Sequence, residues 1–197
     1  MTAGPFVLSI LMNPQARKPG AEEWMCSIHL RVSPAREDAP TEDRAPVPPL
    51  ILTVGWSLIR SLCETLLEDD FVLRLDIRDP PDAAWLWPKV YQSIEDLELR
   101  MKDIVGTYPN ADHSKFYPLF IWAVPHEYEY EAARAIDEFM EDGGDKALAR
   151  RALDFGAIRL SFSETGCTIS AACKVTTTLQ PMIKDASAHS PIPVVWI

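Results

Sequence analysis

Glycine is scarce in this sequence, and its scarcity excludes several kinds of site. Only eight of the 197 residues are glycine. Phosphate-binding loops of the forms G-x-x-x-x-G-K-[ST] and G-x-G-x-x-G do not occur, and neither does the G-x-S-x-G turn that exposes a nucleophilic serine. The sequence therefore offers no support for nucleotide binding or serine hydrolase chemistry by those routes.

Cysteine is also sparse, with four residues and no C-x-x-C pair. Cys26 and Cys63 lie at apolar positions of an expected strand and an expected helix. Cys167 and Cys173 lie six residues apart on one expected strand, about 20 Å from each other, which is too far for a disulfide. The pattern predicts four reduced, buried thiols and neither a disulfide framework nor a zinc site.

Long apolar runs and positive charge are lacking as well. No run approaches the roughly 20 apolar residues that cross a bilayer, and no lysine or arginine precedes the apolar start of the chain. We therefore expect a cytoplasmic protein, with export by a route without a cleaved signal as the alternative. Lysine and arginine total 19 against 29 acidic residues, a net charge of −10. This charge disfavours binding to nucleic acid or an anionic membrane and favours a basic partner.

The length and composition predict a single globular domain over residues 1–197. Hydrophobic residues make up 47% of the chain, enough for one substantial core. The segment from Pro34 to Pro49 is rich in proline and charge and has almost nothing to bury. We expect it to be a mobile loop.

The hydrophobic periodicity predicts an α+β fold. Alternating apolar residues favour a hairpin at each end of the chain, and helical spacing dominates between them. We expect a mostly antiparallel β-sheet built from terminal hairpins and covered by about three α-helices. The expected strands cover residues 6–11, 24–32, 50–54, 71–77, 116–124, 158–162, 167–175 and 192–197. The expected helices start at Trp56, at about Pro88 or Ser93, and near His126, with a further short helix near residues 146–153.

The segment that starts at His126 and Glu127 resembles the start of a zinc-protease helix only superficially. Such a helix needs a second histidine four residues after the first, and position 130 is Tyr130. A single histidine between a strand and a helix is more often a cap or surface residue. We predict no metal site and no cofactor.

A catalytic alternative remains open at this stage. Asp112, His113 and Ser114 place an acid, a base and a hydroxyl side by side, but consecutive residues on a loop point in different directions and fit turn chemistry better. A small hydrolase that uses carboxylates with His113 or His126 is therefore the alternative hypothesis. It requires one of those histidines and an acid to converge in a pocket.

Two tryptophans lie outside the regular periodic segments. Trp85 and Trp87 occur in the proline-bounded stretch DPPDAAWLWP. Burial in the core is the more common fate of large aromatic residues. An amphipathic ring held near the surface is also suited to contact with a partner, so both remain candidates.

Acidic residues are concentrated between Glu127 and Asp145, a segment that carries −7 of the net charge. The helix dipole favours acids in the first turn but disfavours Glu138, Glu141 and Asp142 near the negative C-terminal end. Their presence indicates either simple solubility or a field that attracts a cationic partner.

Our main hypothesis is a non-catalytic, acidic protein-binding module, such as an inhibitor or immunity-type protein that neutralises a basic protein. The analogy is compositional and rests on no family motif. A homo-oligomer with a self-complementary apolar patch is a further alternative. The candidate partner-binding residues are Glu127, Glu131, Glu138, Glu141, Asp142, Asp69, Asp70, Trp85 and Trp87.

Overall fold

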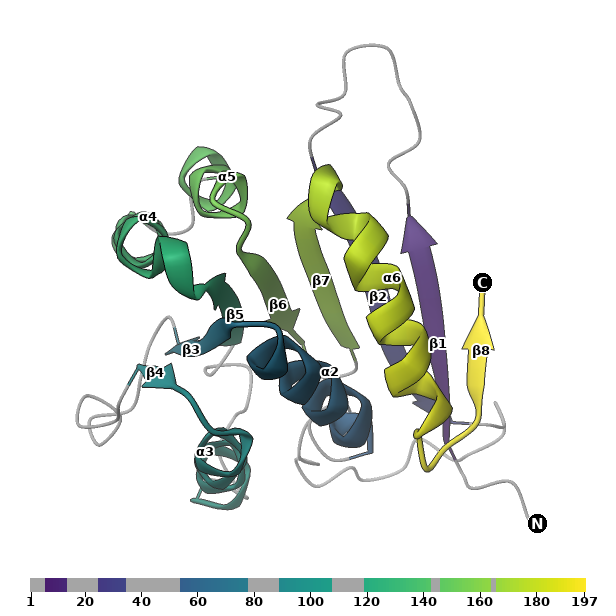
Figure 1. Cartoon of the computed structure of the whole chain (residues 1–197). Coiled ribbons are helices and arrows are strands. Elements are labelled where there is room, and N and C mark those ends of the chain that lie inside the picture. The colour runs from purple at the N-terminus through teal and green to yellow at the C-terminus, as the bar shows by residue number, and fades with distance from the viewer. Residues whose placement is uncertain are drawn as a thin grey trace.

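The computed structural model describes residues 6–13, 25–34, 54–77, 89–107, 119–142, 146–163 and 166–197. These residues form one eight-stranded sheet in the order β4-β3-β5-β6-β7-β2-β1-β8 (Figure 1). All neighbouring strands are antiparallel except β1 and β8, which are parallel. The expected α+β class with a mostly antiparallel sheet is confirmed.

The strands are β1 (Phe6–Asn13), β2 (Met25–Pro34), β3 (Phe71–Ile77), β4 (Val90–Tyr91), β5 (Leu119–Pro125), β6 (Ile158–Phe162), β7 (Gly166–Ala172) and β8 (Val194–Trp196). Within the described residues there are five α-helices: α2 (Trp56–Glu68), α3 (Ile94–Thr107), α4 (Glu129–Glu141), α5 (Lys146–Asp154) and α6 (Cys173–Ala188). A short 3₁₀ helix, η3 (His126–Tyr128), leads into α4.

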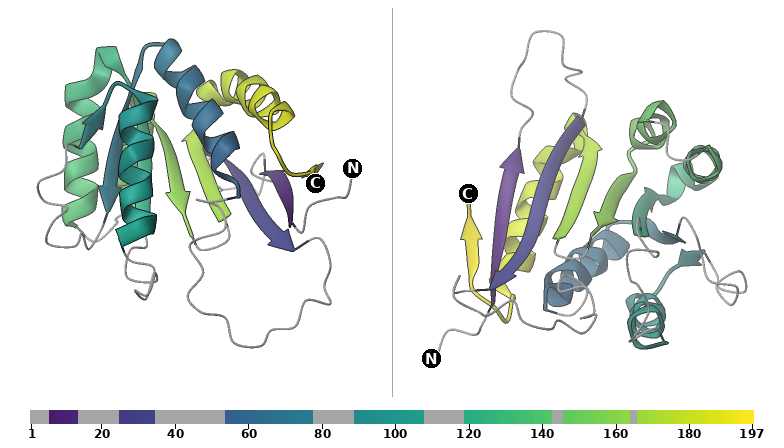
Figure 2. Two further views of the ribbon diagram at one scale, coloured as in Figure 1. Left: turned by 90° about the horizontal axis from the view of Figure 1, so that it is seen from below. Right: turned by 180° about the vertical axis from the view of Figure 1, so that it is seen from behind.

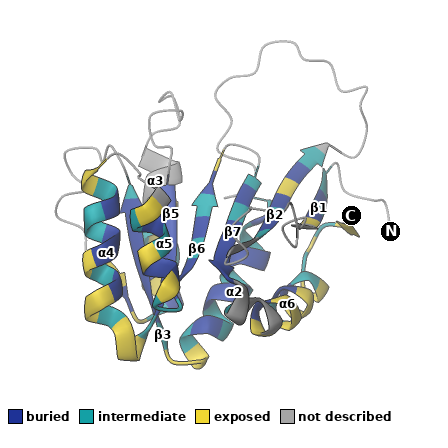
Figure 3. Cartoon of the chain, turned by 90° about the horizontal axis from the view of Figure 1, so that it is seen from above, coloured by how far each residue is buried: buried dark blue, intermediate teal, exposed yellow. Residues whose placement is uncertain are grey.

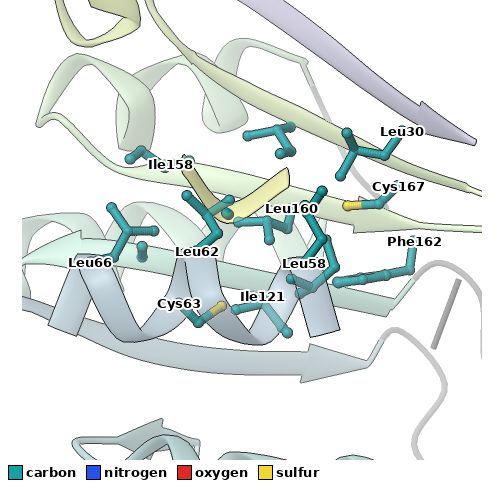
Figure 4. Close-up of a cluster of buried hydrophobic side chains, with 14 of the residues drawn as sticks. Leu30, Leu58, Leu62, Cys63, Leu66, Ile121, Ile158, Leu160, Phe162 and Cys167 are labelled. Atoms are coloured by element: carbon teal, nitrogen blue, oxygen red, sulfur yellow. The ribbon is translucent and has the colours of Figure 1, made fainter. Parts of the chain in front are cut away.

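Helices lie on both faces of the sheet (Figures 1 and 2). The α2 face is covered by α2, α3 and α6, and the α4 face by α4 and α5. The main core fills the α2 face, where Leu58, Leu62 and Leu66 of α2 meet Ile121, Leu160 and Phe162 of the sheet (Figure 4). The second core surrounds Trp122 on the α4 face.

The strand alternation explains why two cores form. β5 is buried along nearly its whole length because its odd-numbered residues face α2 and its even-numbered residues face α4. β6 buries only alternate residues, Ile158, Leu160 and Phe162, on the α2 face. The expected central strand at 116–124 is thus confirmed over the residues that the structure describes.

The expectation of about three helices was too low, chiefly because α6 was missed. The alternation through Cys173 and Val175 favoured a longer strand, the three threonines that follow are β-branched, and Pro181 disfavours a helix. The strand ends at Ala172, and the chain turns into a helix that buries Leu179, Ile183 and Ala186. The helical stripe outweighs the local strand preference because it covers the open α2 face of β2 and β7.

Several predictions fall in whole or in part on residues that the structure does not describe. They are the loop at 34–49, the short strand at 50–54, Trp85, Trp87 and His113. The N-terminal hairpin, the 158–172 hairpin, the strand at 71–77, and the helices at 56, 93 and 146 are present. No helix among the described residues is long and apolar enough to span a membrane.

Candidate functional site

Two acidic segments that are distant in the sequence meet at one end of the sheet. The turn after α2 carries Glu68, Asp69 and Asp70, and η3 with the first turn of α4 carries Glu127 and Glu131. Phe71 pairs with Pro125 at the matching ends of β3 and β5, and the backbone N–H of His126 donates to the carbonyl oxygen of Asp70 at 3.0 Å. We call these five carboxylates the acidic end.

The carboxylates of the acidic end face solvent without counter-ions. All five residues are exposed, and the exposed positions continue along the outer side of α4 (Figure 3). None of them forms an ion pair within the described part of the chain. Glu68 and Asp69 also lie at the negative end of the α2 dipole, so the local potential is strongly negative.

Asp70 has a backbone conformation that usually belongs to glycine. Its φ is 64°, in the left-handed region that aspartate tolerates better than most residues but at some conformational cost. A glycine would end α2 with less strain. The chain therefore has a charged side chain at a position where the backbone conformation alone would favour glycine.

An open groove of about 580 Å³ adjoins the acidic end. It runs between α2 and the start of α3, and the residues that line it include Glu64, Glu68 and Glu95 together with Ser61, Thr65 and Ser93. Glu68 belongs to both the groove and the acidic end. The groove is therefore a polar, negatively charged depression continuous with the exposed carboxylates.

Arg60 partly neutralises the groove from one side. Its guanidinium lies 2.6 Å from Glu64 and 3.5 Å from Glu95. Hydrogen bonds from the Glu95 backbone N–H and from Ser93 lower the pKa of the Glu95 carboxyl, so it is ionised in the neutral range. Glu68 has no such partner within the described residues and carries the free charge of the groove.

The middle of α4 is not a free acidic surface. Glu138 accepts from Arg134 at 3.1 Å and from Arg151 of α5 at 3.1 Å. Asp137 binds Arg74 of β3 and Lys89. Glu129 lies 3.2 Å from the Nδ1 atom of His126. These pairs leave the two ends of the helix as its free acids.

Glu141 and Asp142 form the far end of the helix. Both are exposed and have no ion pair among the residues described. The 13 residues of α4 span about 20 Å at 1.5 Å per residue, so this pair lies far from Glu127. The candidate residues therefore divide into the acidic end, the neutralised Glu138, and a separate far pair.

A buried ion network lies beneath α4 and was not anticipated from the sequence. Arg74 and Asp76 are 4% and 5% exposed, and Arg74 donates from Nε to Asp76 at 2.7 Å and from Nη1 to the carbonyl oxygen of Ala133 at 3.3 Å. Burial lowers the pKa of Arg74, but its bonds to Asp76 and Asp137 outweigh burial, and the net shift is upward. The network fastens α4 to β3.

His126 does not lie in a catalytic arrangement. It is exposed in η3, the acid that it contacts is Glu129 of the following turn, and no histidine lines the groove between α2 and α3. The described residues contain no group of three or more His, Cys, Asp or Glu that could hold a metal. The hydrolase alternative stays a prediction, since His113 lies outside the described residues.

Two of the four cysteines have described side chains, and both are buried and free. Burial, and secondarily the charge of Glu64, raises the pKa of the Cys63 thiol to about 12, and burial raises that of Cys167 well above its usual value. Both belong to the main core (Figure 4). Cys173 begins α6, so its expected position on a strand with Cys167 was wrong.

A second polar surface lies on the α4 face of β7, β2 and β1. The Nδ1 atom of His29 lies 3.1 Å from the hydroxyl oxygen of Thr168, and its Nε2 atom lies 3.3 Å from that of Ser27. Arg31 is exposed two residues farther along β2. The alternation of polar residues in the sequence marked this side as outward-facing, but did not show that the strands align its hydroxyls.

Comparison with known proteins identifies no relative. No family model, curated protein or solved structure matches the chain.

Proposed function

We propose that this protein is a non-catalytic module that binds a basic protein through the acidic end, and acts as an inhibitor or immunity-type protein by covering the partner's cationic surface. The observation that supports the proposal is the meeting of the 68–70 turn with the start of α4, held by the bond from the His126 N–H to the Asp70 carbonyl oxygen. This contact joins two acidic segments into one unpaired negative surface.

The difference between paired and unpaired carboxylates favours this end of the molecule. Glu138 already accepts two arginines, so a partner cation gains little there. Asp69, Asp70 and Glu127 are without counter-ions among the described residues, so a lysine or arginine from outside meets their full field. We therefore infer that the contact is centred on the acidic end and does not extend along all of α4.

The groove between α2 and α3 can receive one cationic side chain of the partner. An arginine that enters beside Glu68 meets a carboxylate it can bind with two parallel hydrogen bonds, and hydroxyls from Ser61 and Thr65 can accept its remaining donors. A basic loop of the partner would then have one residue in the groove and its neighbours over Asp69 and Asp70. Such a contact neutralises the very residues with which a basic protein binds its own target.

The experiment compares two matched pairs of charge reversals. The partner is isolated by its association with the tagged protein at low salt, and its association rate is then measured by stopped-flow fluorescence from low to high salt. Electrostatic steering predicts a rate that falls as salt rises. The double variant Asp69→Lys/Glu127→Lys is expected to slow association about tenfold or more at low salt.

The control is Glu141→Lys/Asp142→Lys, which makes the same change in net charge about 20 Å away on the same helix. It is expected to slow association about twofold at most, because only the long-range field changes. Equal effects of both variants would show that net charge, and not the acidic end, attracts the partner. A rate independent of salt would contradict the proposal altogether.

A further inference from the structure

β8 leaves an apolar edge without charged side chains on the sheet. β8 lies at the end of the strand order, and no described strand lies beyond it. Val195 and Trp196 are 48% and 43% exposed, and Ile197 is 72% exposed. Leu11 of the adjacent β1 is exposed beside them. Exposed apolar residues on an edge strand are a common template for pairing with another strand.

The hydrogen bonds of β8 show which backbone groups are free. The carbonyl oxygen of Pro193 accepts from Leu8 at 2.9 Å, and the N–H of Ile197 donates to Ile10 at 2.9 Å. Backbone groups of a strand point alternately to its two sides, so residues 193, 195 and 197 face β1. The N–H and C=O groups of Val194 and Trp196 therefore point outward from the sheet.

The charge pattern indicates what can approach this edge. From Ala186 to Ile197 the chain contains no Asp, Glu, Lys or Arg, and neither does β1. Two molecules that each carry −10 repel each other over most orientations. Their repulsion is weakest when the strands without charged side chains face each other, so the edge is suited to a second copy of the same chain.

The opposite edge of the sheet is protected in a way that β8 is not. β4 has only two residues and is preceded by the exposed Lys89. Short edge strands and lysines are the usual devices against strand pairing. Among the described residues, β4 exposes the apolar side chain of Val90 beside Lys89, whereas β8 and Ile197 expose three apolar side chains with no charged side chain next to them.

We propose that the chain forms a homodimer in which β8 pairs antiparallel with β8 of a second copy. With Val195 opposite Val195 of the second copy on a twofold axis, Val194 of each copy faces Trp196 of the other. Those pairs exchange backbone hydrogen bonds through their outward groups, and the valines form the close pair without hydrogen bonds. The sheet then continues across both molecules.

The dimer is expected to be weak and concentration-dependent. Three-residue strands and a few apolar side chains bury less than the roughly 1,200 Å² typical of stable complexes. Light scattering is therefore measured over a concentration series from about 1 to about 500 µM, which covers micromolar dissociation constants. The mass should rise from the monomer value of 22.1 kDa toward twice that value.

The test variant is Val195→Lys, which places a charge at the centre of the proposed contact on an exposed side chain. It should remain monomeric throughout the series with an unchanged circular dichroism spectrum. Leu99→Lys makes the same chemical change at an exposed position of α3 and should dimerise like the parent. Both variants reduce the net negative charge equally, so loss of the dimer in one alone reports the contact.

A second variant tests the register. Val195→Cys brings two thiols together across the axis at the Cα separation of about 4.5 Å found in close antiparallel pairs, which suits a disulfide. Oxidation with diamide should give a dimer on non-reducing gels, and Leu99→Cys and the parent should not. A parent that stays monomeric at the highest concentration, or a Val195→Lys variant that still dimerises, overturns the proposal. Neither result bears on partner binding, since the acidic end adjoins β3 and β5, whereas β8 is the strand at the opposite edge of the sheet.

Discussion

The α4 face of the sheet has two halves that accommodate polar side chains in opposite ways. The covered half, β3, β5 and β6, lies under α4 and α5 and buries Trp122, Phe120 and the Arg74–Asp76 pair. α5 also contacts β7, where Ser170 is buried, so the open half consists of β2, β1 and the part of β7 around Thr168. No helix lies over this half among the described residues (Figure 2), and it carries Ser27, His29, Arg31 and Thr168. Both halves contain charged residues, but only in the covered half are they buried and in need of a partner.

The comparison shows that a polar residue on a strand does not by itself predict exposure. Arg74 and Arg31 both alternate with apolar neighbours, and each reads as an outward residue. A helix covers the first, so a carboxylate on the same strand and another on the helix neutralise it. Water solvates the second at little cost.

Arg159 lies on β6, where the covered half meets the open half. Its guanidinium lies 5.7 Å from the ring centres of both Trp122 and Phe139, and its Nε has no hydrogen-bond partner. Burial lowers its pKa. The aromatic faces supply part of the stabilisation that carboxylates supply for Arg74.

Replacing Arg74 should give the largest loss of stability of the changes considered. A small loss would contradict the comparison between the two halves. Arg74→Ala leaves Asp76 buried without its cation, and we expect the free energy of unfolding in urea to fall by about 3–5 kcal/mol. Arg31→Ala, the control on the open half, should change it by about 0.5 kcal/mol or less. Equal losses would show that the two halves are covered alike.

A double replacement distinguishes the effect of the unpaired buried charge from the effect of the lost side-chain volume. Arg74→Met/Asp76→Leu removes both buried charges and keeps most of the volume, so we expect it to recover much of the stability that Arg74→Ala loses. A double variant no more stable than Arg74→Ala would mean that the bonds to Ala133 and Asp137 hold α4 in place, and not the balance of buried charge.

The fold was largely predictable because its cores follow simple periods. The strand at 71–77 and the helices at 56 and 93 show clear apolar patterns, and each lies where expected. α6 was missed because threonines and Pro181 conceal its stripe, and only the open sheet beside β2 shows why a helix is needed there. The tertiary requirement overrides the local preference.

The candidate site was predictable only as a set of charges. The sequence shows that Glu127 to Asp142 is acidic, but not that Glu138 faces Arg151 of the next helix. It likewise lists Asp69 and Asp70 without indicating that they lie beside His126. Pairing between distant segments decides which acids remain free, and pairing depends on strand register.

Asp137 is a partly exposed member of the ion network in the covered half. The effect of its ionisation on stability therefore tests the difference between the two halves. Burial acts to raise the pKa of Asp137, but hydrogen bonds and attraction from Arg74 and then Lys89 outweigh it, so the pKa is lowered. A lowered pKa stabilises the fold above the ordinary aspartate pKa of about 3.9, and this stabilisation is lost as the pH falls through the lowered value. The parent should therefore lose stability in acid.

Asp137→Asn should flatten that acid loss, as measured by urea unfolding from neutral pH to about pH 2. Asp137 is nearly half exposed, so after allowance for solvent screening the difference should be about 1 kcal/mol or less. Glu131→Gln removes an exposed, unpaired acid from the same helix and should leave the slope unchanged. If stability depends on pH in Asp137→Asn as it does in the parent, Asp137 contributes nothing measurable to the stability of the ion network.

The smallest expected effect belongs to the open half. Thr168→Val keeps the side-chain shape and removes the hydroxyl that His29 contacts at 3.1 Å. Because both residues are half-buried and water can replace the lost bond, the unfolding free energy should fall by about 1 kcal/mol or less. His29→Ala and the double variant complete a cycle whose coupling should be about 0.5 kcal/mol. A coupling several times larger would mean that water cannot reach the pair. The open half would then be shielded from solvent as the covered half is, and its hydroxyls would be buried polar groups of the core.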